Sequence, residues 1–195
     1  MRLTRFLALL STLAILAFAA AGCGGGDSSS ASGTKPETWS ADVCGALQTW
    51  EDDLKSGSQQ LSSDIRSSTD LKSVKQKLVA FLQNAQQSTE KMVADVKSAG
   101  APAVKDGPAI QSDLESGLTE ARGSFQHAVT QAKKLPTNDP RALTTGLSSL
   151  AQTIQGELTA TGNHFSNLDT KYDVGDLNKA MAAEPSCKPF VSASG

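Results

Sequence analysis

The sequence has few histidines, cysteines and aromatic residues, and it has no excess of charge of either sign. Two His and three Cys in 195 residues leave little room for a metal cluster. Lys and Arg number 18 against 20 Asp and Glu, and this balance argues against a dedicated nucleic-acid-binding protein. Hydrophobic residues make up 38%, which is enough for a folded core. The chain length predicts one domain, alone or with appendages.

Motifs that carry common chemistries are also missing. There is no phosphate-binding loop and no GxSxG nucleophile elbow. His127 and His164 fall on different predicted helices without HExxH spacing, so we expect two separate surface residues; a joint site across two helices is the alternative. The acidic run at 51–53 is expected to face solvent, with a weak cation site as the alternative, and the segment 173–184 lacks the ligands and glycine of a calcium loop. We therefore predict no catalytic residue, no metal and no cofactor.

One apolar run stands at the start of the chain. Residues 6–21 are apolar except for Ser11 and Thr12, and the run follows Arg2 and Arg5. Sixteen helical residues span about 24 Å, which is short for a transmembrane anchor. A basic start, a short apolar core and small residues at its end are typical of a secretory signal.

The four residues at positions 20–23, Ala-Ala-Gly-Cys, resemble a bacterial lipobox. The resemblance implies that a diacylglyceryl group with acyl chains such as palmitate is placed on the sulfur of Cys23, and that residues 1–22 are a signal peptide removed before it. The expected location is the extracytoplasmic face of the cell membrane, with lipid as the attachment. An ordinary signal peptide cleaved nearby, or an uncleaved anchor, is the alternative.

The number of cysteines fits this resemblance. If Cys23 carries lipid, Cys44 and Cys187 remain as an even pair in an oxidising compartment. We predict a disulfide between them, which would close a loop of about 143 residues. Two free buried thiols are the alternative.

A change of composition separates the lipid site from the rest. Residues 24–37 are rich in Gly and Ser and have no large apolar side chain, so 23–37 is expected to be a flexible tether. The alternative is that this segment folds onto the body, which we place at 38–190.

The body shows apolar residues at alternating spacings of three and four, the period of amphipathic helices. We predict an all-α fold, a four-helix up-down bundle with a short C-terminal helix at 176–183 that the disulfide ties to the first helix. Ser40, Ser68 or Thr69, and Asp139 are the expected N-caps. The predicted apolar stripes run from Trp39 to Ile65, from Leu71 to Val96, from Ile110 to Leu135 and from Leu143 to Tyr172.

Short motifs in the body are similar to those of small helical lipoproteins of actinobacteria and related Gram-positive lineages. These motifs are Trp39-Ser40-Ala41-Asp42-Val43-Cys44 with Trp50, Ser98-Ala99-Gly100-Ala101-Pro102 with Asp106-Gly107, and the late Cys187. The resemblance implies a bundle fold and a surface location. It carries over no catalytic or binding residue.

Together these features predict a membrane-anchored, non-enzymatic module that interacts with a protein partner in the cell envelope or maintains the envelope. The contacts expected are the membrane, through lipid on Cys23, and this envelope protein, but no nucleic acid; the oligomeric state is left open. The alternative is a carrier or sensor that holds a small apolar ligand between helices, which needs an interior cavity of at least ~300 Å³. Trp39 and Trp50 are expected as core anchors, with a ligand-stacking role as the alternative.

Overall fold

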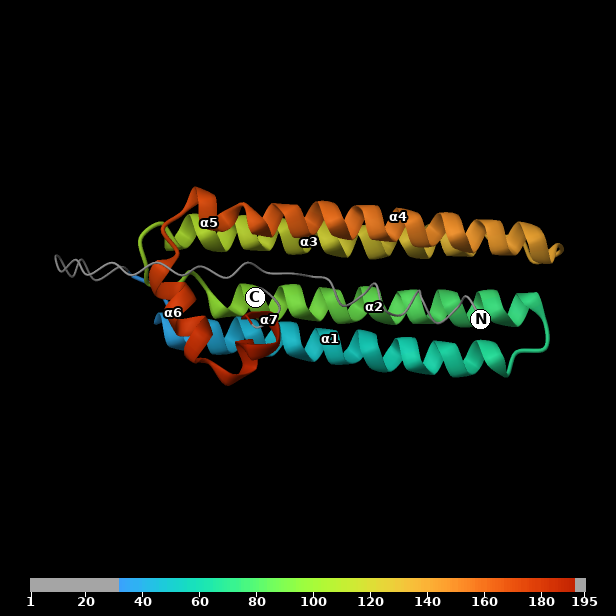
Figure 1. Cartoon of the computed structure of the whole chain (residues 1–195), viewed down its shortest axis with the longest axis horizontal. Helices are drawn as coiled ribbons and strands as arrows, with labels where there is room; N and C mark the ends of the chain where they lie inside the picture. The colour runs from blue at the N-terminus through green and yellow to red at the C-terminus, as the bar shows by residue number, and fades with distance from the viewer. Residues whose placement is uncertain (1–31, 192–195) are drawn as a thin grey trace.

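The computed structural model describes residues 32–191, without the side chains of 161–166 and 191. This part of the chain is all-α and contains no strand; four long helices run alternately up and down (Figure 1). The predicted fold class is confirmed. Among the described residues, no helix combines the length and hydropathy needed to cross a membrane.

The four long helices have nearly equal lengths, and four short elements follow them. The long helices are α1 (Pro36–Arg66), α2 (Leu71–Ala99), α3 (Gly107–Lys133) and α4 (Pro140–Ser166). The short elements are α5 (Leu168–Lys171), α6 (Gly175–Ala183), the 3-10 helix η3 (Pro185–Cys187) and α7 (Lys188–Val191). The fourth stripe was expected to continue to Tyr172 in one helix, but the chain breaks after Ser166 and resumes as α5.

Local capping explains two of the helix starts. The side chain of Asp70 accepts a hydrogen bond of 2.8 Å from the backbone N–H of Ser73, so Asp70 is the N-cap of α2 instead of the expected Ser68 or Thr69. Asp139 accepts from the backbone N–H of Arg141 at 2.8 Å, at the predicted start of α4. A carboxylate at each site satisfies a donor that the first helical turn leaves free.

The first helix begins earlier than expected. It starts at Pro36, and proline suits a first turn because its missing N–H would have no partner there. Ser40, the expected N-cap, therefore lies within the helix and is fully buried. The helix continues through Gly57 without interruption, although glycine destabilises a helix interior.

The long helices pack in chain order. The main interfaces are α1 with α2, α2 with α3, and α3 with α4, while α6 and η3 pack against α1. Two apolar clusters fill these interfaces, one shared by α1, α2, α3 and α6 and the other by α2, α3 and α4. Their buried members are Trp39, Val43, Ala46, Met92, Val96, Ala99, Ile110, Leu118 and Leu177 in the first, and Leu82, Ala128, Val129, Ala132, Leu135, Leu143 and Leu150 in the second.

The two ends of the bundle are different, and we name them the base and the tip. The base contains the start of α1, the α2–α3 connection at 100–106, and α6. The tip contains the α1–α2 turn at 67–70 and the α3–α4 turn at 134–139; both turns lie at the right in Figure 1. The chain reaches α1 from the base.

The residues just before α1 are bonded to the base. Thr34 pairs with Pro102 as an isolated bridge: its N–H donates to Ala101 O at 2.8 Å, and its carbonyl accepts from the N–H of Ala103 at 2.7 Å. A side chain at Gly33 would place its Cβ 2.5 Å from the carbonyl oxygen of Ala101, so this close approach requires glycine. The expected tether limit at Glu37 therefore falls inside ordered structure, and the body begins a few residues earlier than 38.

Candidate functional site

Cys44 and Cys187 form the disulfide that the sequence predicted. Their sulfurs are 1.98 Å apart and their Cα atoms 5.0 Å apart, and both residues are completely buried. The bond joins η3 to the first third of α1 across 143 residues of sequence. It fixes the C-terminal segment, including the buried Leu177 and Ala180 of α6, to the base half of the bundle.

Ser40 lies one helical turn before Cys44 and next to this disulfide. Its carbonyl oxygen is 3.5 Å from the sulfur of Cys187, and no part of the residue is exposed. Its hydroxyl oxygen has no hydrogen-bond partner among the described residues. A buried hydroxyl without a partner costs stability, so the side chain is tolerated here because it is small enough to let η3 approach α1.

The two tryptophans are anchors between helices. Trp39 is 4% exposed, and its indole N–H donates to the carbonyl of Gly100 at 2.9 Å and to the side-chain oxygen of Gln111 at 3.1 Å. Trp50 is half-buried, and its indole N–H donates to the hydroxyl of Thr89 at 2.9 Å. Each indole thus joins α1 to α2, and Trp39 also joins α1 to α3. These contacts fit the core role predicted for both residues.

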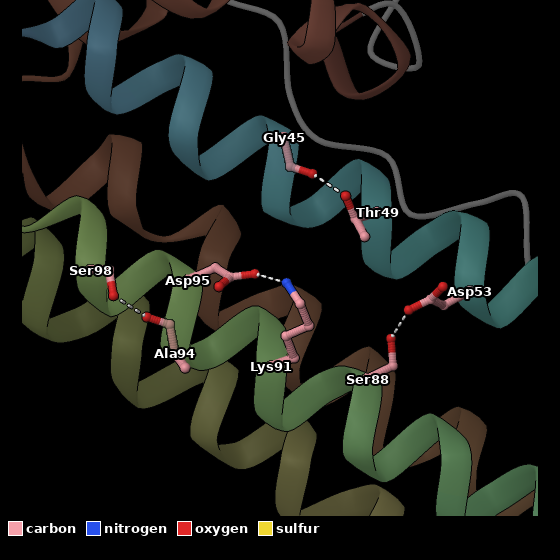
Figure 2. A network of polar contacts seen from close by, with 8 residues as sticks. All are labelled: Gly45, Thr49, Asp53, Ser88, Lys91, Ala94, Asp95 and Ser98. Atoms are coloured by element: carbon pink, nitrogen blue, oxygen red, sulfur yellow. Dashed lines mark hydrogen bonds and ion pairs between the residues drawn. The ribbon is translucent and has the colours of Figure 1, made fainter.

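An open hollow of about 350 Å³ lies between α1 and α2 in the base half. Figure 2 shows the helix faces that border it and a single contact between the two helices, in which Ser88 donates to Asp53 at 2.6 Å. The other polar groups drawn there bond within their own helix, such as Lys91 with Asp95 at 2.5 Å. The residues that line the hollow are Asp42, Gly45, Ala46, Thr49, Asp95, Ser98 and Ala99.

The chemistry of this hollow is that of a solvated groove. Its walls are small or acidic side chains, and it opens to solvent along the outer face of α1 and α2. An apolar ligand needs an enclosed pocket lined by large hydrophobic and aromatic side chains. Ser98, the serine of the hollow, donates to the backbone carbonyl of Ala94 at 2.9 Å and has no base in hydrogen-bond contact among the described residues.

His127 lies on the surface of α3. One ring nitrogen is 2.7 Å from a carboxylate oxygen of Glu157 on α4, and the other is 2.9 Å from the side-chain amide of Gln131. Its side chain is 52% exposed, so this contact links α3 to α4 at the solvent boundary. The side chain of His164, the other histidine, lies outside the described residues, and the predicted separation of the two stays a prediction.

Asp113 on α3 binds two residues at the end of the short helix α5. One of its carboxylate oxygens accepts from the ammonium of Lys171 at 2.6 Å and from the hydroxyl of Tyr172 at 2.9 Å. The hydrogen bond to Asp113, and then that to Tyr172, raise the pKa of Lys171 above its ordinary value. The ammonium also lies 5.0 Å from the centre of the Tyr172 ring. This cluster holds the chain after α4 against the base of α3.

The structure brings together only part of the predicted site. Cys44 and Cys187 meet, whereas Cys23 and the lipobox lie outside the described residues. Among the described side chains, which exclude 161–166, no group of three or more His, Cys, Asp or Glu is arranged to hold a metal ion. The bridge at Thr34 and the cluster at Asp113 were not predicted from the sequence, because Thr34, Asp113 and Lys171 belong to no motif or apolar stripe.

Comparisons with known proteins add no relative. The chain matches no protein-family model, no curated protein and no solved structure.

Proposed function

We propose that this protein is a lipoprotein held on the extracytoplasmic face of the cell membrane through Cys23, and that its helical body is a non-enzymatic module for interaction within the envelope. The observation that carries the proposal is the Cys44–Cys187 disulfide. Disulfides persist in oxidising compartments outside the cytoplasm. Because the disulfide uses two of the three cysteines, Cys23 is left as the single thiol, and it stands at the position where the lipobox resemblance places the lipid.

The bonded residues before α1 support the same arrangement. Thr34 is fixed to the base by two backbone hydrogen bonds and by its hydroxyl, which donates to the carbonyl of Ala99 at 2.6 Å. A force applied to the chain before Thr34 would therefore act on the base of the bundle and not on one helix end alone. Only ten residues lie between Cys23 and Thr34, and the eleven Cα–Cα steps that join the two reach at most about 38 Å.

An interaction role fits the described surface better than catalysis or transport of an apolar ligand. The hollow between α1 and α2 is open and its walls are polar or small. The hydroxyls that line it, those of Thr49 and Ser98, donate to backbone carbonyls of their own helices at 2.9 Å. No observation favours the carrier alternative.

Replacement of Cys23 tests the anchor. Cys23→Ser should abolish a diacylglyceryl mass on the N-terminal peptide and move the protein from the detergent phase to the aqueous phase in a phase-partition assay. Ser28→Ala, a change of similar size five residues later, should leave both properties as in the wild type. A wild-type protein whose N-terminus carries no lipid, or a Cys23→Ser variant that partitions like the wild type, would refute the proposal.

Cross-linking on intact cells then tests the interaction role. The wild-type protein should give discrete cross-linked products that the Cys23→Ser variant, freed from the membrane, gives in much lower yield. Equal yields from both variants would show that membrane attachment does not position the body for its partner.

A further inference from the structure

The fold separates charge along the bundle, with the basic end at the tip. Residues 62–78 and 131–143, which form the tip, carry seven Lys or Arg and three Asp. The base segments 32–42, 95–117 and 166–191 carry six Lys and ten Asp or Glu. The sequence has no long basic run that would indicate this excess of positive charge, because the cations of the tip come from all four long helices and their turns.

The acidic residues of the tip are engaged within the protein, whereas most of its basic residues are not. Asp70 and Asp139 accept from the backbone at the starts of α2 and α4, and Asp64 accepts from Lys77 at 3.4 Å. Lys75 donates to a backbone carbonyl. Five cations of the tip are exposed and have no carboxylate in ion-pair contact among the described residues: Arg66, Lys72, Lys133, Lys134 and Arg141.

Two of these cations lie where helix stability disfavours them. Lys72 and Arg141 are the second residues of α2 and α4, at the positive end of each helix dipole, and neither helix has an acidic residue in its first turn. Arg66 and Lys133, in contrast, lie in the last turns of α1 and α3, where a cation stabilises the helix. Helix stability therefore explains Arg66 and Lys133 but not Lys72 and Arg141.

We propose that the tip binds a linear polymer with repeated phosphate groups, of the polyphosphate kind and not a nucleic acid. Exposed cations at one end of the bundle attract such a chain by counterion release. A protein partner is less suited, because protein interfaces depend on buried aromatic and apolar anchors. Ile65, at 36%, is the exposed large hydrophobic residue of the described chain, and the tip offers no other.

The choice of a polymer over a membrane surface rests on the proposed anchor at Cys23. The 29 residues of α2 span about 43 Å between base and tip. A lipid before Thr34 would hold the base close to the bilayer, and the acidic base would be repelled by anionic headgroups. The tip would then face away from the membrane, toward the space that an extended polymer can occupy.

The test measures binding of labelled long-chain polyphosphate to the full chain in a neutral detergent, by fluorescence anisotropy at several salt concentrations. Binding in this assay does not require lipid on Cys23, so its failure is separate from failure of the anchor. If all five cations contact phosphates, a plot of the logarithm of the binding constant against the logarithm of the salt concentration should have a slope of about −3 to −4. Lys72→Glu with Arg141→Glu should weaken binding at least about tenfold and reduce the steepness of the slope by roughly 1.5.

Lys105→Glu with Lys188→Glu is the matched control, since both lysines are exposed at the base and the charge change is the same. It should change the affinity less than about twofold. The thermal midpoint of the tip variant should not fall, because the new acids lie at helix N-termini, so misfolding would not mimic the result. The proposal is overturned by absent binding, by equal weakening in both variants, or by preference of the wild type for vesicles of anionic phospholipid over polyphosphate.

Discussion

Removal of the disulfide is the perturbation whose size the structure defines best. Cys44→Ala with Cys187→Ala deletes two completely buried sulfurs and frees a segment that closes a loop of 143 residues. The chain-entropy relation gives about 17 cal/mol/K for this loop, or about 5 kcal/mol at room temperature. Native α6 and η3 would still pack against α1 without the bond, and residual structure in the unfolded chain subtracts from the entropy term. We therefore expect the free energy of unfolding to fall by about 3–5 kcal/mol.

The loss should not be uniform along the chain. In the double variant, α6 is held mainly by burial of Leu177 and Ala180, and a buried leucine is worth about 1.5–3 kcal/mol. The C-terminal segment should therefore open locally before the bundle unfolds. Amide hydrogens of 175–187 should exchange much faster than in the wild type, whereas those in the centre of α2 should be limited by global unfolding.

Urea denaturation followed by tryptophan fluorescence measures the first effect, and hydrogen exchange measures the second. Trp50 bonds to Thr89 between α1 and α2, so its fluorescence reports the bundle, whereas Trp39 also shares an apolar cluster with Leu177 of α6. Wild type treated with a reductant should behave like the double variant, and the reductant should not change the double variant further. An unchanged urea midpoint together with unchanged exchange at 175–187 would refute the loop-closure reasoning.

Three smaller predictions test local features. Asp70→Ala should lower the free energy of unfolding by about 1 kcal/mol through loss of the α2 cap, whereas Thr69→Ala should leave the urea midpoint unchanged. Gly107→Ala places a Cβ 1.9 Å from a backbone carbonyl oxygen and should destabilise by about 1–3 kcal/mol; Gly123→Ala, with nothing within 4 Å, should stabilise by about 0.5–1 kcal/mol in the same assay. The pKa of Lys171 is raised in the folded protein, so its ion pair with Asp113 stabilises the fold fully below the ordinary lysine pKa of about 10.4. This stabilisation is lost as the pH rises through the pKa that Lys171 has in the folded state. The stability advantage of wild type over Lys171→Met should therefore shrink above about pH 10.5, and an advantage that grows there would contradict the assignment.

The helices could be predicted because the sequence signals for each helix lie within that helix and at its ends. Apolar residues at spacings of three and four mark the buried face of each helix, and Gly100 and Pro136 mark where two of them end. The cysteine pair was predictable for a different reason, since the lipobox resemblance removed one of three cysteines from consideration. Neither inference required knowledge of how the helices pack.

The N-caps show where local information becomes ambiguous. Ser68, Thr69 and Asp70 are adjacent and all suit an N-cap, so sequence alone does not choose among them. Packing decides, because Leu71 must face the second apolar cluster, and this fixes the register in which Asp70 reaches the N–H of Ser73. Ser40 was placed at a helix start on the same local reasoning, but the bridge at Thr34 fixes the chain earlier.

The contacts that relate the base to the rest of the chain could not be predicted. Thr34 bonds to residues 99–103 through backbone groups that every sequence has, and the only local signal is the absence of a side chain at Gly33. The basic tip likewise depends on helix order, since its cations are dispersed between residues 66 and 141 and lie at one end only because two turns lie there. Charge patterns of this kind become visible only when topology is known.

The bridge at Thr34 also connects the proposed anchor with the proposed tip site. If the chain left α1 without further contacts, a lipid at Cys23 would hold the body by one helix end and leave its orientation free. Because Thr34 is bonded to the α2–α3 connection, the attachment point is shared by three helices at the base. The axis of the bundle is then set by the base, and repulsion between the acidic base and an anionic bilayer favours orientations in which the tip is farthest from the membrane. If Cys23 carries the lipid, the bridge at Thr34 would place the attachment at the base and leave the tip as the end that faces away from the membrane.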